Sequence, residues 1–260
     1  MEATLKFVRE HRSIVQTLIM RCDVLTCCRT GTGECGNQRN SSIPKRPGSC
    51  TNNHGIGGVI TGDVSPACRR MLPALSELGV RSEIWLGEDD AMSSARYLST
   101  HPQQTASALL QVAKRNPGLV GFNLDPEAEE VATEQDLDRF SEFLGQVTKS
   151  LNVADPSIRF SVDVACDTRQ SHMTSNCSRL ARSGINRLMN MDTYNAGDFE
   201  AWSRSRLFPA LDAVPLDVLG VGLGVWTDSR TVGTCAPPRV PPSSLPRSNP
   251  TAVRAVAQGT

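Results

Sequence analysis

Residues 103–127 read QQTASALLQVAKRNPGLVGFNLDPE, and this stretch predicts one helix followed by one strand. Residues 103–114 carry apolar side chains at helical spacing, Asn116-Pro117-Gly118 ends the helix, and residues 119–125 form a short apolar run. Carboxylates come at the end of the run. The same order of helix, apolar run and acidic residues recurs along the chain, and this order is typical of βα units.

Six strands are predicted, each separated from the next by a helix. They cover residues 15–21, 81–86, 119–125, 158–164, 185–191 and 216–225. Strands that alternate with helices favour parallel pairing through right-handed crossovers. The prediction is an α/β fold, a TIM-barrel-like (β/α)₈ domain that is incomplete, with about six of its eight parallel strands.

The domain is predicted to cover residues 1–226, with a long loop inside it and a tail behind it. Residues 27–57 are rich in Cys, Gly, Ser and Asn and predict the loop, beside a short β-like run at residues 58–60. Residues 227–260 are rich in Pro and Ser, and six prolines fall within residues 236–260, so a disordered tail is predicted. A complete barrel of this kind takes about 250 residues, so too few remain for eight units.

Composition argues against several classes of partner. The 27 Lys and Arg residues balance the 27 Asp and Glu residues, which gives no electrostatic reason to expect nucleic acid. The most apolar window, residues 213–226, is shorter than the roughly 20 residues that a membrane-spanning helix needs. We expect no membrane partner, and nothing in the sequence predicts a protein partner.

Hints about the compartment conflict. The first twenty residues are charged and show no signal peptide, but nine cysteines and the sequons at Asn40 and Asn176 suggest a secreted parent protein. Localisation is left open. Five of the cysteines gather around the long loop, which predicts disulfides within it: Cys22, Cys27, Cys28, Cys35 and Cys50.

The chemistry is predicted at the carboxyl ends of the strands, where ligand sites form in parallel α/β proteins. Residues of one face alternate along a strand at spacings of about 6.5 Å, so Asn123, Asp125 and Glu127 share one side. Two carboxylates this close favour a proton donor beside an anion, the pair that glycosidic cleavage needs. Asp163 and Asp192 end the next two strands.

These residues resemble the signature of the chitinase-like family 18 glycoside hydrolases, an Asp-x-x-Asp-x-Asp-x-Glu run on the fourth barrel strand. The last two acids of the signature fall on Asp125 and Glu127, and its first two fall on Val120 and Asn123. Residues 191–195, Met-Asp-Thr-Tyr-Asn, resemble the family's Met-x-Tyr-Asp, with a match at Tyr194. The family's Ser-x-Gly-Gly on the third strand is absent, and Trp85-Leu86-Gly87-Glu88 stands there instead.

The resemblance implies a chitinase-like hydrolase that cleaves N-acetylglucosamine-containing glycans with retention and needs no cofactor or metal. Glu127 would protonate the leaving oxygen, the substrate's own N-acetyl oxygen would attack, and Asp125 and Tyr194 would stabilise the resulting oxazolinium. Asn123 would hydrogen-bond Asp125. The remaining predicted contacts to substrate are Asp163, Asp192, Asn195, Trp85 and Trp226.

Two alternatives remain open at this stage. The Asn at position 123 fits a weak or inactive, lectin-like carbohydrate-binding relative, and the strand-end acids Asp125, Asp163 and Asp192 fit a Mg²⁺-dependent TIM-barrel enzyme. Trp85 and Trp226 are sugar-stacking platforms in one interpretation and core packing in the other.

The strand count also suggests a truncated gene product. Aligned to the family's strand order, the first and eighth strands are missing, and these two are neighbours in a closed barrel. The prediction is an open wedge with two exposed, apolar edge strands, a feature that promotes aggregation.

Overall fold

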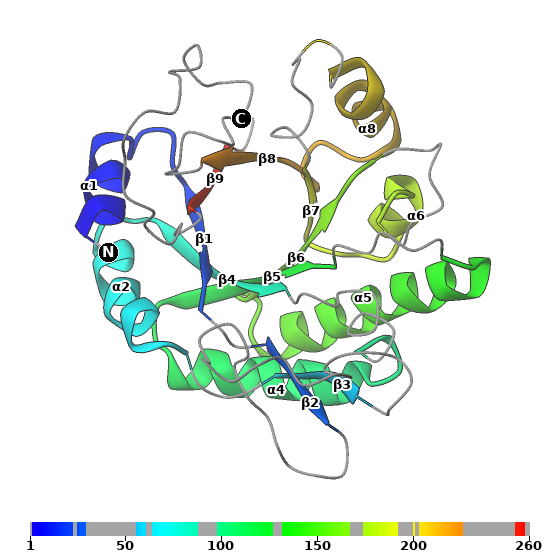
Figure 1. Ribbon diagram of the computed structural model, residues 1–260, viewed down its shortest axis with the longest axis horizontal. Helices are drawn as coiled ribbons and strands as arrows, with labels where there is room; N and C mark the ends of the chain where they lie inside the picture. The colour runs from blue at the N-terminus through cyan, green and yellow to red at the C-terminus, as the bar shows by residue number, and fades with distance from the viewer. Residues whose placement is uncertain are drawn as a thin grey trace, which may run out of the picture.

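The computed structural model describes residues 2–22, 25–29, 56–60, 64–87, 98–126, 132–166, 174–191, 200, 203–225 and 253–257. Within these residues one closed sheet runs in the order β1-β4-β5-β6-β7-β8-β9. Figure 1 looks into this barrel, with helices around its outside. The strands are β1 (Thr17–Arg21), β4 (Arg81–Gly87), β5 (Leu119–Asp125), β6 (Arg159–Val164), β7 (Arg187–Asn190), β8 (Leu219–Val225) and β9 (Val253–Ala257).

Six of these strands, β1 and β4 to β8, pair in parallel, each with its neighbour. They are the six strands that the sequence predicts, and the incomplete TIM-barrel-like α/β class is confirmed. Helix lies in the connections β4–β5, β5–β6, β6–β7 and β7–β8, and a crossover of this kind lets consecutive strands pair in parallel.

The predicted open wedge is wrong for the described residues, because β9 fills it. β9 runs antiparallel to both neighbours, with Val256 opposite Thr17 of β1 and opposite Gly222 of β8. The strands next to the missing positions therefore have hydrogen-bonding partners, and no edge of the described sheet is left open.

The boundaries of the predicted loop and tail also differ from the structure. The segment 227–260, expected without secondary structure, contains β9, whose five residues are too few to signal a strand by periodicity. The predicted loop 27–57 begins and ends inside an antiparallel pair, β2 (Leu25–Arg29) with β3 (Ile56–Ile60). In the sequence β2 begins four residues after the end of β1 at Arg21.

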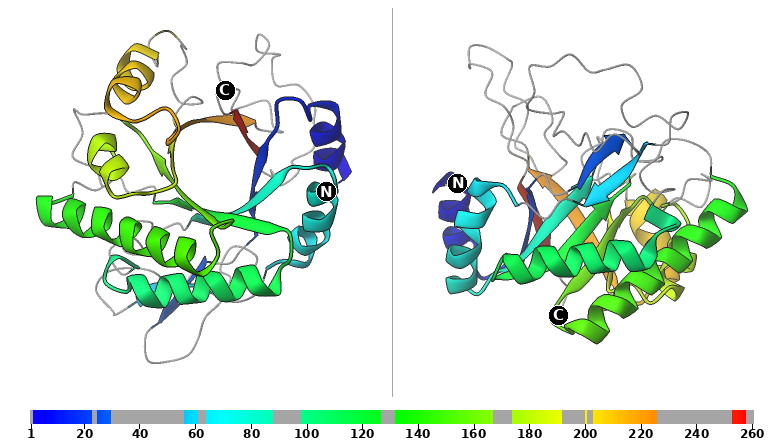
Figure 2. Two further views of the ribbon diagram at one scale, coloured as in Figure 1. Left: turned by 180° about the vertical axis from the view of Figure 1, so that it is seen from behind. Right: turned by 90° about the horizontal axis from the view of Figure 1, so that it is seen from below.

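Helices cover the outside of the barrel (Figure 2). They are α1 (Glu2–Glu10), α2 (Pro66–Glu77), α4 (Pro102–Arg115), α5 (Glu134–Ala154), α6 (Cys177–Arg182) and α8 (Phe208–Ala213), the last preceded by the π-helix η2 (Ser203–Leu207). Side-chain hydrogen bonds to the backbone mark where α2 and α5 begin. The Ser65 side chain caps α2, and Thr133 with Asp136 forms a reciprocal capping box at α5.

The main core lies between the helices and the outer face of the sheet. α5 contributes Phe140, Phe143 and Leu144, each at most 1% exposed, and Phe143 meets Phe160 of β6 edge to face. Each fully buried side chain of this size contributes about 1.5–3 kcal/mol. Because the apolar residues point outward from the strands, alternation turns their polar neighbours into the barrel interior.

Among the described residues, two disulfides hold the chain near the carboxyl ends of strands: Cys22–Cys68 and Cys166–Cys177. The predicted partner of Cys22 was a cysteine of the long loop, and this is wrong: Cys22 is bonded to Cys68 of α2. The side chains of Cys27, Cys28, Cys35 and Cys50 lie outside the described residues.

No helix in the described part of the chain is both long enough and apolar enough to cross a bilayer.

The Asn176 side chain of one sequon caps α6 by accepting a hydrogen bond from the Arg179 N–H.

Removing β9 tests its role in closing the barrel. A chain that ends at residue 252 leaves β1 and β8 with unpaired edges, so we expect a lower urea midpoint and concentration-dependent association. Urea unfolding and light scattering during gel filtration measure both. The matched control ends at Ala257 and keeps β9; equal behaviour of the two chains would show that β9 does not close the sheet.

Candidate active site

The interior face of the barrel carries polar side chains from four neighbouring strands. Alternation sets this face, so residues two apart on one strand point the same way. The inward residues are Glu83 and Trp85 on β4, Asn123 and Asp125 on β5, Ser161 and Asp163 on β6, and Arg187 on β7. All except Trp85 are at most 6% exposed, so their polar groups need partners inside the protein.

Asp125 ends β5 at the carboxyl-terminal side of the barrel, where the predicted site lies. Its Oδ2 accepts a hydrogen bond of 2.7 Å from the indole Nε1 of Trp85 on the neighbouring strand. The carboxylate is only 6% exposed. A charge-assisted hydrogen bond of this kind holds a carboxylate in one orientation more firmly than a neutral one does.

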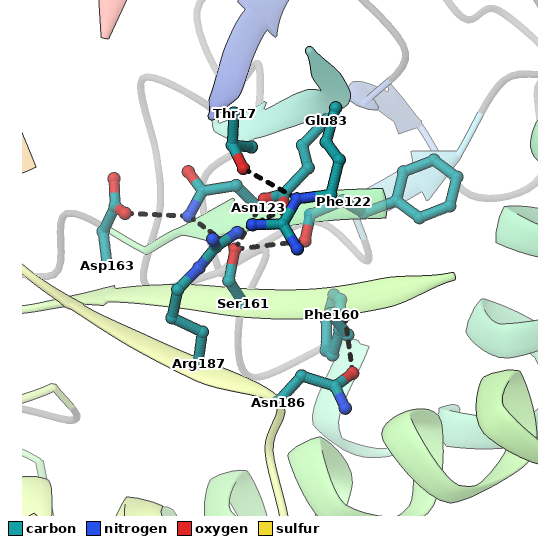
Figure 3. A network of polar contacts seen from close by, with 10 residues as sticks. Thr17, Glu83, Phe122, Asn123, Phe160, Ser161, Asp163, Asn186 and Arg187 are labelled. Carbon is teal, nitrogen blue, oxygen red and sulfur yellow. Dashed lines mark hydrogen bonds and ion pairs between the residues drawn. The ribbon is translucent and has the colours of Figure 1, made fainter. Parts of the chain in front are cut away.

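The amide nitrogen of Asn123 donates its two hydrogens to side chains of the neighbouring strand β6. Nδ2 lies 2.8 Å from Asp163 Oδ1 and 3.1 Å from Ser161 Oγ. The predicted partner of this amide was Asp125, but the amide hydrogens are directed to β6 (Figure 3). Asn123 Oδ1 is buried and has no hydrogen-bond partner among the described residues.

The network continues to a buried ion pair deeper in the barrel. Ser161 Oγ donates to Glu83 Oε2 at 3.2 Å, and the guanidinium of Arg187 pairs with Glu83 Oε1. Glu83 and Arg187 are 1% and 6% exposed at their side chains. The pair joins β4 to β7 across the barrel, as Figure 3 shows.

A second arginine enters the same interior. Arg81 Nε donates to Thr17 Oγ1 of β1 at 3.2 Å. Burial and, after it, the positive charge of Arg187 lower the pKa of Arg81, and the Glu83 carboxylate opposes this shift. The Glu83 carboxylate pairs with Arg187, and its negative charge also acts on Arg81.

Two glycines leave the space that the long side chains occupy. Gly121 lies opposite Glu83 in the sheet, and a Cβ there would stand 2.9 Å from Glu83 Cγ and 2.7 Å from the Arg159 carbonyl oxygen. A Cβ at Gly220 of β8 would stand 2.6 Å from Met189 Sδ and 3.3 Å from Arg187 Cδ. At Gly121 the close atom is a backbone oxygen, so a larger residue would displace the sheet, whereas at Gly220 the close atoms belong to flexible side chains that can shift.

The sequence reasoning missed Glu83, Ser161 and Arg187. The signal was present as alternation: Arg81, Glu83 and Trp85 fall on one face of β4, and Ser161 and Asp163 on one face of β6. Polar residues inside an apolar strand pattern indicate an interior face that is itself polar. The partner of each residue could not be read, because Glu83 and Arg187 are 104 residues apart.

Of the predicted site residues, the structure brings together Asn123, Asp125, Asp163 and Trp85. The others lie outside the described residues: Glu127, Asp192, Tyr194, Asn195 and Trp226. Trp85 packs against the buried cluster Ile19, Met189 and Met191. These contacts match the core-packing alternative that the sequence left open for it.

Hydrogen-bond donors hold one oxygen of each described carboxylate. Asp125 Oδ2 accepts from the indole N–H of Trp85, and Asp163 Oδ1 accepts from the amide N–H of Asn123. Within the described ranges, no three His, Cys, Asp or Glu side chains gather in a way that could hold a metal. The Mg²⁺ alternative also needs Asp192, which lies outside these ranges.

No family model and no curated protein matches the sequence. Several solved structures are similar. A chitinase from Chromobacterium violaceum ATCC 12472 shares 17% identity over 65% of this chain and 58% of its own, with a TM-score of 0.49. The chitinase RmChi1 from Rhizomucor miehei shares 14% identity over 76% of this chain and 68% of its own, with a TM-score of 0.45. A GH18 chitinase from Cycas revoluta in complex with (GlcNAc)3 shares 15% identity over 67% of this chain and 63% of its own, with a TM-score of 0.46. The chain spans about three fifths of the length of the first of these.

Removing Arg187 tests the buried ion pair. Arg187→Met leaves the Glu83 carboxylate buried without its closest counter-charge, so we expect a loss of about 3–5 kcal/mol in the free energy of unfolding, measured with urea. Arg204→Met is the matched control, because Arg204 pairs with Glu200 at 72% exposure on each side and such pairs contribute at most about 1 kcal/mol. Equal losses would contradict a structural role for the buried pair.

Asn123→Asp tests the polarity of the network. This change brings the signature closer to the family pattern but sets two carboxyl groups at the 2.8 Å contact with Asp163, where they must share one proton. We expect a loss of about 1–3 kcal/mol at neutral pH that shrinks as the pH falls towards about 4, where carboxyl groups take up protons.

The exchange variant Asn123→Asp/Asp163→Asn is the control for this prediction. It restores one amide and one carboxylate at the contact, so part of the lost stability should return. If the single and double variants are equally unstable at every pH, repulsion between the carboxylates is not the cause.

Proposed function

We propose that this protein is a chitinase-like glycoside hydrolase that cleaves N-acetylglucosamine-containing glycans by substrate-assisted, retaining catalysis. The observation that carries the proposal is the placement of Asp125. The carboxylate that aligns with the signature's last Asp ends β5 inside the barrel, is nearly buried, and is fixed by a 2.7 Å hydrogen bond.

In this reaction the protein supplies a proton and a fixed charge. Glu127, two residues after Asp125, donates a proton to the glycosidic oxygen, and the substrate's acetamide oxygen attacks the anomeric carbon. Asp125 orients the acetamide and stabilises the cationic oxazolinium, and Tyr194 donates a hydrogen bond to the same group. The proton that Glu127 gave leaves with the released sugar. Water then attacks the anomeric carbon of the oxazolinium, the bond from this carbon to the acetamide oxygen breaks, and the Glu127 carboxylate takes a proton from the attacking water.

The surroundings of Asp125 suit this role. Its hydrogen-bond donor comes from a side chain packed against Ile19, Met189 and Met191, so the carboxylate lies beside apolar groups rather than in bulk water. A charge in such a place interacts more strongly with a developing cation than the same charge does in water. Asp163 and Asn123 form the polar wall next to it.

Carbohydrate binding without turnover is the second candidate. The observation in its favour is Asn123, a neutral amide where the signature has a carboxylate, with both amide hydrogens committed to β6. An amide keeps polar contacts to a sugar but adds no negative charge to the site. Turnover and binding therefore have to be measured separately.

Glu127→Gln tests the proposed function on acetylated chitooligosaccharides. Loss of the general acid should lower kcat by roughly 10²–10⁴-fold with little change in substrate affinity. Glu134→Gln is the matched control, because Glu134 is 80% exposed at the start of α5, and it should keep wild-type turnover. Hydrolysis is followed with a chromogenic leaving group, and the anomer first formed is identified by NMR.

Three further arms separate the alternatives. Deacetylated oligosaccharides of the same length should not be cleaved, because they lack the attacking acetamide. Turnover that survives EDTA contradicts the Mg²⁺-dependent enzyme. Calorimetric binding of acetylated oligosaccharides without any hydrolysis by the wild-type protein overturns the hydrolase in favour of the carbohydrate-binding relative.

A further inference from the structure

Trp85 of β4 lies within hydrogen-bond distance of the Asp125 carboxylate on the neighbouring strand β5. Trp85 is opposite Asn123 in the β4–β5 register, and Gly87, two residues further on, is opposite Asp125. The indole reaches along its own strand towards Gly87 and across to Asp125, where Nε1 and Oδ2 are 2.7 Å apart. The same ring packs on Ile19, Met189 and Met191 from β1 and the end of β7.

Gly87 makes this arrangement possible. A Cβ at position 87 would stand 2.1 Å from Cζ2 and 2.4 Å from Cε2 of the Trp85 ring, far inside contact distance. The indole thus occupies the place that a side chain at position 87 would take, directly beside Asp125 in the sheet. A larger residue there would force the ring, and with it the Nε1–H, away from the carboxylate.

From this geometry we infer that Trp85 is a positioning residue for Asp125: its Nε1–H fixes the carboxylate in the orientation that the reaction uses, and Gly87, which has no side chain, leaves the space that the indole occupies. The inference rests on the proposed function and adds residues that the signature does not contain. A purely packing role would need the ring but not the Nε1–H. A positioning role needs the donor itself.

Asn123 does not perform this task in the described structure. Its two donor contacts go to Ser161 and Asp163, so its amide serves β6. Trp85 is a donor that reaches Asp125 from β4, the strand on the other side of β5. Trp85 of β4 donates to the Asp125 carboxylate, and Asn123 of β5 donates to the Asp163 carboxylate. The register of the sheet therefore fixes the spacing of the two carboxylates.

The first test is the hydrogen bond itself, measured by NMR on the full chain with ¹⁵N-labelled tryptophan. The chain has three Trp residues, and Trp85→Phe identifies the Trp85 indole signal by its disappearance. In wild type the indole proton should exchange with solvent roughly tenfold or more slowly than in Asp125→Ala, as a hydrogen bond to a charged group predicts. Equal exchange rates in the two proteins would overturn the inference.

The second test is turnover of acetylated chitooligosaccharides. Trp85→Phe keeps an aromatic ring and loses the donor, so kcat should fall by about 10–100-fold, the effect of a misplaced catalytic group, while KM changes less than about twofold. Gly87→Ala should give a similar loss without altering either partner of the bond. In a Trp85→Ala background Gly87→Ala should change kcat less than about twofold, because no ring remains to displace.

Each remaining outcome decides the matter. A slowly exchanging indole together with wild-type kcat in Trp85→Phe overturns the positioning role and leaves the proposed function standing. Additive losses for Gly87→Ala and Trp85→Ala overturn the role of Gly87. A wild-type protein that cleaves no acetylated oligosaccharide removes the proposed function and the positioning role together, and the NMR result then stands only as a structural bond.

Discussion

The ion pair between Glu83 and Arg187 is the constraint on which the barrel interior depends. Both groups are charged and almost fully buried, so each would be costly without the other. Because they stand on β4 and β7, their contact fixes the distance across the barrel. Ser161 donates to Oε2 of Glu83, the oxygen that Arg187 does not contact, and Asn123 donates to Ser161. The orientations of Ser161 and Asn123 therefore depend on the ion pair.

This dependence gives the network one direction of hydrogen-bond donation. Asn123 is a double donor, Ser161 passes a hydrogen on to Glu83, and Arg187 completes the second oxygen of Glu83. Asp163 and Asp125 stand at the carboxyl-terminal side as acceptors from Asn123 and Trp85. The polar interior thus ends in two fixed carboxylates at the side where α/β barrels bind their ligands.

Much of the fold could be predicted from the sequence because its signals are local. The apolar runs that become β4, β5 and β6 are bounded by Gly, Pro and polar residues, and the caps at Ser65 and Thr133 are hydrogen bonds within three or four residues. β9 could not be predicted, since its stability comes from pairing with β1 and β8 rather than from its own five residues. β3 was predicted in part, as the β-like run at residues 58–60, but β2 was not, because its Cys-containing run lacks the alternation that marks a strand.

The candidate site divides in the same way. The period of two placed Asn123 and Asp125 on one face, and this part of the prediction needed no knowledge of other strands. The Trp85 contact needed the β4–β5 register and the space at Gly87, and the Glu83–Arg187 contact needed the closed sheet. The partners of a side chain across a barrel are a property of topology, and no local pattern contains them.

The position of β9 has a consequence for biosynthesis. Thr17 pairs with Val256, so the hydrogen bonds that close the ring join two segments that are far apart in the sequence. During synthesis β1 and β8 have no partner on the edges that face β9 until residues 253–257 have been made. Long-range contacts of this kind slow folding, so we expect closure of the ring to be a late step.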